Sequence, residues 1–131
     1  MIIDDILMDD LLEKANSNIR KRVNMDLRNG ANDTSQRMLN AILPSSFIDV
    51  HRHCTTSETV ILLRGSLTEI FYDEKGVECA RYELSTATGV IGLQIPASQW
   101  HTLICHEPSV IIEVKDGKYE PLLGTDIWTR E

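Results

Sequence analysis

The residues best suited to chemistry are histidines and a glutamate, most of them in the segment HRHCTTSETVILLRG at 51–65. His51 and His53 are separated by a single residue, so on an extended strand both imidazoles lie on the same face. Glu58 opens the next apolar run after a short polar stretch, so its carboxylate can return to that pair. His101 begins a strand behind the turn-forming stretch PASQ. Imidazoles with a carboxylate suit a divalent metal such as zinc, iron, manganese or nickel, and the pattern predicts one ion.

Two histidines on a strand are often only polar residues at a surface, so the rest of the chain has to support the metal hypothesis. The chain has four histidines, and three of them belong to this candidate site. The fourth, His106, has the opposite strand parity to His101 and is expected to face away from it. Amidohydrolases also use a His-x-His pair, but on a TIM barrel of about 250 residues, which a chain of 131 residues excludes.

The elements that must position these residues are short apolar runs divided by turn residues. The predicted strands are QRMLNAIL at 36–43, FIDVHRH at 47–53, ETVILLR at 58–64, SLTEIFY at 66–72, VECARYEL at 77–84, IGLQI at 91–95, WHTLICH at 100–106 and SVIIEVK at 109–115. No helical pattern separates them. The fold class is therefore predicted to be all-β, an antiparallel sandwich or barrel.

The N-terminal part has a different texture. Residues 4–16 have the apolar spacing of a short helix, with Ile3, Ile6, Leu7, Leu11 and Leu12 on one stripe. The basic segment IRKRVNMDLR is interpreted as irregular, and NGANDTS has a loop composition. The predicted organisation is a single domain over 1–131, with the helix and an extension at 1–36, a β core at 37–115 and a C-terminal tail at 116–131.

The strand predicted at 58–64 is apolar on both faces. Val60 and Leu62 share a face with Glu58, while Ile61 and Leu63 lie on the other. Such a strand must be covered on both sides. The second cover is expected to be the N-terminal helix or a second subunit, and the chain is predicted to form a homodimer.

Composition excludes several classes of function. Twenty acidic residues against thirteen basic ones give a net charge of −7, which disfavours nucleic acid and acidic membrane surfaces as partners. The start MIIDDILMDD lacks the basic and uninterrupted apolar regions of a signal peptide. The three cysteines are odd in number and widely spaced, as expected of reduced thiols. The predicted location is the cytoplasm.

At this point the chain resembles the cupin family. The first cupin motif runs Gly-x5-His-x-His-x3–4-Glu-x6-Gly. His51, His53, Glu58 and Gly65 match it in type and spacing, whereas Ser45 stands at the leading glycine. The resemblance implies a jelly-roll β-sandwich or barrel.

The second cupin motif runs Gly-x5-Pro-x-Gly-x2-His-x3-Asn, and here the match is partial. Pro96 and His101 match the pattern. The departures are Val90 at the first glycine, beside Gly89, Ser98 at the second glycine and Cys105 at the asparagine. All four metal positions are retained. The resemblance thus implies one divalent ion held by His51, His53, Glu58 and His101.

The chain is also similar to the WbuC-type cupins over nearly its whole length. The N-terminal helix and the segments SNIRKRVNMDLR, SQRMLNAILPSSFIDVHRH and IPASQWHTLICHEPSVIIEVKDGKYEP carry this likeness. Members are often associated with O-antigen and surface-polysaccharide gene clusters. The resemblance implies a metal site and a sugar context rather than a particular reaction.

The reaction stays open at this point. A six-coordinate ion would keep two positions for water or substrate, which suits a sugar isomerase or epimerase. The alternatives are a non-enzymatic module that binds a sugar or metabolite at the metal, and an iron-dependent dioxygenase. The expected ligand is a small molecule such as a sugar or nucleotide sugar. Catalytic residues, including any general acid or base, are not assigned.

Two further residues are candidates for contact with a substrate. Arg37 lies on the first predicted strand and can pair with an anionic group, or it can be an ordinary surface arginine. Cys105 shares strand parity with His101 and is expected to face inward. A small core residue is the simpler interpretation of that cysteine.

Overall fold

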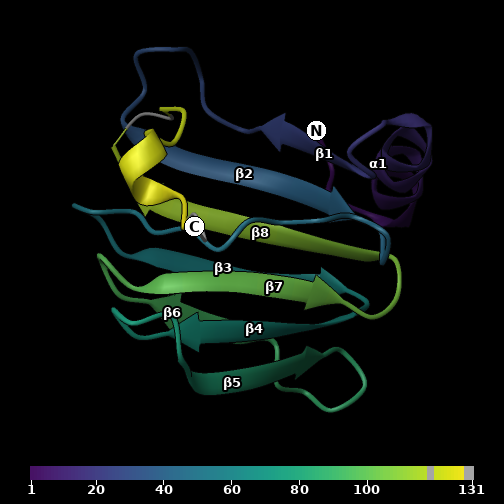
Figure 1. The fold of residues 1–131 in the computed structure, drawn as a ribbon. Coiled ribbons are helices and arrows are strands. Elements are labelled where there is room, and N and C mark those ends of the chain that lie inside the picture. The colour runs from purple at the N-terminus through teal and green to yellow at the C-terminus, as the bar shows by residue number, and fades with distance from the viewer. Residues whose placement is uncertain (118–119, 129–131) are drawn as a thin grey trace.

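The computed structural model describes residues 1–117 and 120–128. It confirms the all-β jelly roll with a short N-terminal helix (Figure 1). The elements, in chain order, are α1 (Asp5–Ser17), β1 (Arg22–Asp26), β2 (Ser35–Ile42), β3 (Glu58–Arg64), β4 (Ser66–Tyr72), β5 (Glu78–Ser85), β6 (Gly92–Ile95), β7 (Trp100–Cys105), β8 (Ser109–Asp116) and the 3-10 turn η1 (Gly124–Asp126). No helix among these residues is long and apolar enough to cross a membrane.

Two antiparallel sheets face each other. One has the strand order β1-β2-β8-β3-β6 and the other β5-β4-β7. Apolar side chains from both sheets, among them Leu62, Leu67, Leu84 and Ile111, fill one part of the space between them. Gly65 joins β3 to β4 across the two sheets with φ of +96°, and a Cβ there would lie 2.2 Å from the Ser109 hydroxyl oxygen. The glycine that the cupin motif contains is therefore required by this turn.

The helix forms where the sequence predicts it and covers the outer face of the five-stranded sheet. Asp4 caps it, because its side chain accepts a hydrogen bond of 3.0 Å from the Leu7 amide. Leu11 and Ala15 are buried against β2 and β8, and Leu63 packs into the same cluster. Ile6, which the predicted stripe included, is solvent-exposed instead. The homodimer stays a prediction.

Two strand assignments from the sequence are wrong. Residues 22–26, interpreted as irregular, form the edge strand β1 and pair with β2. Residues 47–53, predicted as a strand, form none, because their backbone groups bond to three different neighbours. His51 bridges His101 of β7, the Arg52 amide donates to the Asp126 carbonyl, and the His53 carbonyl accepts from the Ser98 amide. The segment still follows the edge of β7, which is what positions its histidines.

Candidate metal centre

Three histidines meet at one wall of the space between the sheets. His51 and His53 come from the segment before β3, and His101 lies on β7. One ring nitrogen from each lies within 4.8 Å of the others, which is close enough for a single metal ion. The bridge between His51 and His101 brings their ring centroids to 4.3 Å. The three imidazoles therefore converge as the sequence predicts, and their role as metal ligands together with Glu58 stays a prediction.

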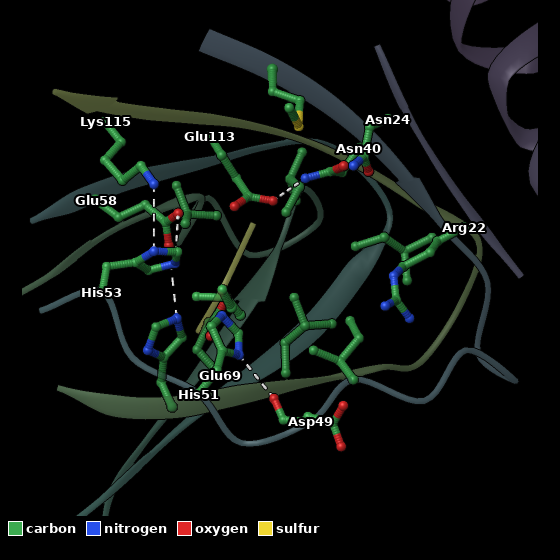
Figure 2. Close-up of a pocket in the computed structure, with 18 of the residues that line it drawn as sticks. Arg22, Asn24, Asn40, Asp49, His51, His53, Glu58, Glu69, Glu113 and Lys115 are labelled. Carbon is green, nitrogen blue, oxygen red and sulfur yellow. Dashed lines mark hydrogen bonds and ion pairs between the residues drawn. The ribbon is translucent and has the colours of Figure 1, made fainter. Parts of the chain in front are cut away.

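Hydrogen bonds orient two of the three imidazoles for metal binding. The Nδ1 atom of His51 lies 2.8 Å from the Asp49 carbonyl oxygen, and Nδ1 of His101 lies 2.8 Å from the Gln99 carbonyl oxygen (Figure 2 includes the first of these). A carbonyl oxygen only accepts, so Nδ1 carries the proton in both rings. The lone pair is then on Nε2, the atom that faces the centre. This second contact is the usual support of a metal-binding histidine.

Glu58 lies beside this group as the first residue of β3. Its two carboxylate oxygens are 3.6 Å from Nε2 of His53 and 3.7 Å from Nε2 of His101. The side chain is buried. Nitrogen donors with a single carboxylate oxygen fit a borderline divalent metal, so the donors present agree with the predicted ion.

Burial keeps two of the histidines in the neutral form that binds metal. Burial, more than any other cause, lowers the pKa of His53 to about 4, and the nearby charge of Lys115 adds to this. Burial likewise lowers the pKa of His101 to about 3, with His51 as the next cause. Both rings are therefore neutral imidazoles at neutral pH, the form in which a ring nitrogen can bind a metal.

The pKa of Glu58 moves the opposite way. Burial raises it well above the ordinary value, and the neighbouring Glu113 carboxylate raises it further. Without a cation the carboxyl group therefore holds its proton more tightly than a surface glutamate does. A divalent ion at the imidazoles would favour the ionised form, so metal binding at Glu58 is expected to release a proton.

A cavity of about 210 Å³ continues from the histidines into the space between the sheets (Figure 2). Its polar lining comes mainly from inward-facing positions of β1, β2, β4 and β8. These residues are Arg22, Asn24, Gln36, Asn40, Glu69, Glu113 and Lys115. Asn40 donates a hydrogen bond to the Glu113 carboxylate. The cavity thus places titratable groups next to the candidate metal centre.

Most of this lining was missed from the sequence, although two signals were present. Glu69 is a lone acidic residue inside the apolar run SLTEIFY, and it is buried. In RVNMD, polar residues alternate with apolar ones. Arg22 and Asn24 face the cavity, while Val23 and Met25 pack toward the helix. Alternation in a strand usually indicates that the apolar residues face inward, whereas beside this polar cavity the polar residues face inward.

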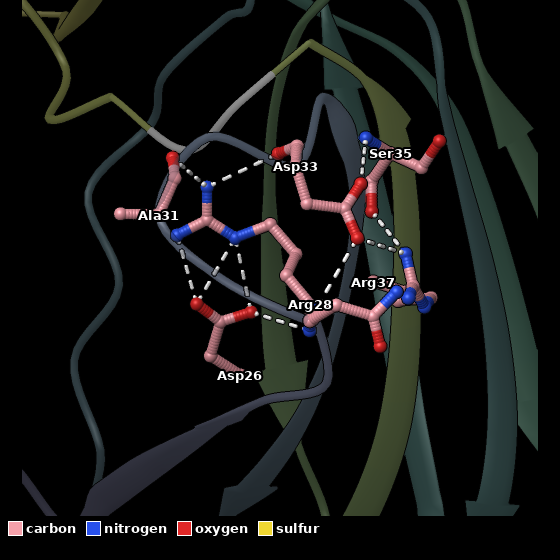
Figure 3. A network of polar contacts seen from close by, with 7 residues as sticks. Asp26, Arg28, Ala31, Asp33, Ser35 and Arg37 are labelled. Carbon is pink, nitrogen blue, oxygen red and sulfur yellow. Dashed lines mark hydrogen bonds and ion pairs between the residues drawn. The ribbon is translucent and has the colours of Figure 1, made fainter.

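Neither residue predicted to contact a substrate lines the cavity. Arg37 bonds the Asp33 carboxylate at 3.2 Å and the Ser35 carbonyl at 2.8 Å, in a network that ties down the loop between β1 and β2 (Figure 3). Cys105 is buried in the apolar core, where its thiol donates to the Glu107 carbonyl. His106 bonds Thr68 at 2.6 Å and lies outside the histidine group, as its strand parity predicted.

The Lys115 ammonium is expected to weaken metal binding, so replacing this side chain gives a first prediction. Its Nζ lies 3.4 Å from Nδ1 of His53. An ammonium donating there holds the His53 proton on Nε2, and its charge repels a cation. Lys115→Met is expected to bind metal about tenfold more tightly, a change of about 1.4 kcal/mol. Competition with a fluorescent chelator measures this affinity, and Arg37→Met, which removes a cation outside the cavity, is the control. Equal or weaker binding by Lys115→Met would contradict the argument.

Solved structures with the cupin fold have an architecture similar to that of this chain. CapF in complex with the inhibitor 3-isopropenyl-tropolone matches with a TM-score of 0.63 and 19% identity, over 75% of this chain and 28% of CapF. The capsular polysaccharide assembling protein CapF from Staphylococcus aureus matches with a TM-score of 0.59 and 16% identity, over 76% and 30%. KdgF from Halomonas sp. matches with a TM-score of 0.59 and 12% identity, over 76% and 81%.

These likenesses establish the fold and not the activity. The chain spans less than a third of CapF, although it spans most of KdgF. A search of curated proteins found no match. A family match covers residues 3–84, more than half of the chain. The chain therefore has the cupin fold and belongs to the family described as a domain of unknown function, DUF6016.

Proposed function

We propose that this protein is a WbuC-type, metal-dependent cupin that isomerises or epimerises a sugar in surface-polysaccharide metabolism. The observation that carries the proposal is the meeting of His51, His53 and His101 beside Glu58 at the wall of a polar cavity. Glu58 is proposed as the fourth ligand. A divalent ion held there would supply a Lewis acid for a sugar carbonyl and the hydroxyl next to it.

Titratable groups in the cavity favour an enzyme over a binding module. Isomerisation or epimerisation through an enediol takes a proton from carbon and returns one, so this route needs groups that exchange protons. Glu69 and Glu113 line the same cavity as the histidines. Burial raises the pKa of Glu69 to about 8, with the Glu113 charge as the second cause. Glu69 therefore exchanges its proton near neutral pH, as a general acid or base does.

The biological setting is proposed on two observations. CapF is named a capsular polysaccharide assembling protein, and part of it shares the fold of this chain. The free thiols Cys54, Cys79 and Cys105 suit a reducing compartment, so the proposed location is the cytoplasm.

Deuterium exchange tests the reaction directly. The metal-loaded protein is incubated in D₂O with a panel of neutral and acidic sugars, and proton NMR follows the signals at carbons next to the carbonyl. The expected result is loss of one such signal by deuterium incorporation, with no loss after chelation of the metal.

Other outcomes of this experiment identify the alternatives. A sugar that binds without any exchange would make the protein a non-enzymatic binding module. Oxygen consumption by the iron-loaded form, without exchange, would make it a dioxygenase. Exchange that continues unchanged in the chelated protein would remove the metal from the proposal.

A further inference from the structure

Three buried side chains in the cavity carry an oxygen atom with no hydrogen-bond partner in the structure. These atoms are Oε1 of Gln36, Oδ1 of Asn40 and Oε2 of Glu69. The three side chains are only 4%, 8% and 2% exposed, and all line the cavity. We call them the acceptor cluster. Buried polar atoms are nearly always paired, so this cluster calls for a partner from outside the protein.

The cluster is spread over both sheets and thus surrounds the cavity. Gln36 and Asn40 lie on β2, with the inward-facing Met38 between them. Glu69 lies on β4 in the other sheet. A single ligand inside the cavity can therefore reach acceptors on two walls.

The atoms without a hydrogen-bond partner are all oxygens, and this limits the chemical groups that a ligand can present to them. A carboxamide oxygen accepts hydrogen bonds and never donates one. The amide nitrogen of Asn40 already donates to Glu113, so its oxygen is the end left for a ligand. The missing partners of the two amides are therefore hydrogen-bond donors, and a hydroxyl group, which both donates and accepts, also suits Glu69 with or without its proton.

The groups that surround the cluster disfavour anions. Its carboxyl neighbours are Glu58 and Glu113. The cations of the lining are Arg22 and Lys115. The Arg22 guanidinium is already bonded to Ser46 and to the Phe47 carbonyl, and Lys115 lies beside His53. A phosphate or carboxylate here would meet acceptor oxygens, which repel it.

A second metal ion is also a poor partner. Among residues 1–117 and 120–128, the histidine group at the candidate metal centre is the one set of three or more possible donors within 4.8 Å of one another. The carboxyl groups of the cavity do not converge in that way. Hydroxyl groups need no such convergence, because each can donate to one acceptor separately.

The size of the cavity limits the ligand further. Its volume of about 210 Å³ is below the roughly 300 Å³ at which sites for drug-sized ligands begin. A single sugar ring is of this scale, whereas a nucleotide sugar is not. Val60, Leu103 and Ile111 add apolar wall for the carbon face of such a ring.

We propose that the acceptor cluster binds the hydroxyl groups of a neutral monosaccharide and discriminates against acidic and phosphorylated sugars. The inference deepens the proposed function and rests on it, because the choice of a sugar among hydroxyl-bearing molecules comes from that function. What it adds is the charge class and the size of the substrate, together with the three residues that select them.

The test compares matched sugars and matched variants. Dissociation constants of the zinc-loaded protein are measured by calorimetry for D-glucose, D-galactose and D-mannose, and for D-glucuronate, D-galacturonate and D-mannose 6-phosphate. The expected result is binding of at least one neutral hexose, with its acidic or phosphorylated counterpart at least about tenfold weaker. Gln36→Met is expected to weaken the neutral hexose at least about tenfold while keeping its metal. Gln94→Met, at an exposed position of β6, is the control.

Several results would overturn the inference. They are tighter binding of the acidic or phosphorylated sugars, unchanged binding by Gln36→Met, and binding of none of the six sugars. If Gln36→Met fails to fold, Gln36→Leu takes its place. Selective binding of neutral sugars without deuterium exchange would leave this inference standing and remove the proposed reaction. Deuterium exchange seen only with acidic sugars would support the proposed reaction and overturn the inference that the substrate is neutral.

Discussion

Glu58→Gln is expected to remain folded but to bind metal at least about 100-fold more weakly than the unchanged protein. The change keeps the size of the side chain and removes the carboxylate beside His53 and His101. The charge of the ion would then be left without its nearest compensating group in a buried site, which is costly. The fold does not depend on Glu58, because apolar side chains elsewhere between the sheets build the core. Elemental analysis of the purified variant, together with chelator competition, measures the effect.

His106→Gln is the matched control for this prediction. His106 bonds Thr68 outside the histidine group, so its replacement should leave metal content unchanged. Equal metal loss in the two variants, or full occupancy in Glu58→Gln, would mean that the ligand assignment is wrong.

Glu69→Gln is expected to raise the free energy of unfolding of the metal-free protein, and to do so increasingly as pH rises. Burial raises the pKa of Glu69 in the folded state to about 8. Below about pH 4.5 Glu69 is protonated in both the folded and the unfolded state, so its ionisation does not lower the free energy of unfolding there. Between about pH 4.5 and pH 8 only the folded state holds it, so stability falls as pH rises through this window. A glutamine side chain has no such proton to lose, and the variant should therefore gain about 3–5 kcal/mol by pH 8.

Urea unfolding at pH 5, 6, 7 and 8 checks this prediction. The difference between Glu69→Gln and the unchanged protein should be small at pH 5 and largest at pH 8. Glu83→Gln, at an exposed position of β5, is the control and should show no such trend. A constant difference across the four pH values would mean that Glu69 is ionised in the folded protein throughout.

Much of the fold could be predicted from the sequence because most strands bury ordinary apolar side chains. The runs at 58–64 and 66–72 are strands with the same bounds in the structure. The helix was likewise predictable from its apolar spacing. In these elements local pattern and tertiary packing agree.

The failures share a physical cause, which is the polar interior. Residues 22–26 were not recognised as a strand because their alternation places the polar Arg22 and Asn24 on the inner face, which an apolar core would otherwise fill. The histidine segment looked like a strand, but its hydrogen bonds are divided among separate partners. Periodicity predicts burial in an apolar core, and it does not anticipate a cavity that is itself polar.

The candidate site was predictable in part for a related reason. The spacing of His51, His53 and His101 carries chemical information that survives without a structure, and their convergence is confirmed. The acceptor cluster carries a weaker signal, because Gln36 and Asn40 are common polar residues and only Glu69 stands out inside an apolar run. The packing of one sheet, with β2, against the other, with β4, brings the three to one cavity.

The pairing of β2 with β8 has a consequence for the order of events during synthesis. Ser35 of β2 lies opposite Asp116 of β8, so the centre of the larger sheet joins segments that leave the ribosome far apart in time. Until residue 116 has emerged, α1, β1 and β2 have no neighbour on their inner side. Contacts between distant parts of a chain form slowly, because loop closure must precede them. In the nascent protein the backbone N–H and C=O groups on this edge of β2 therefore lack their strand partner through most of translation.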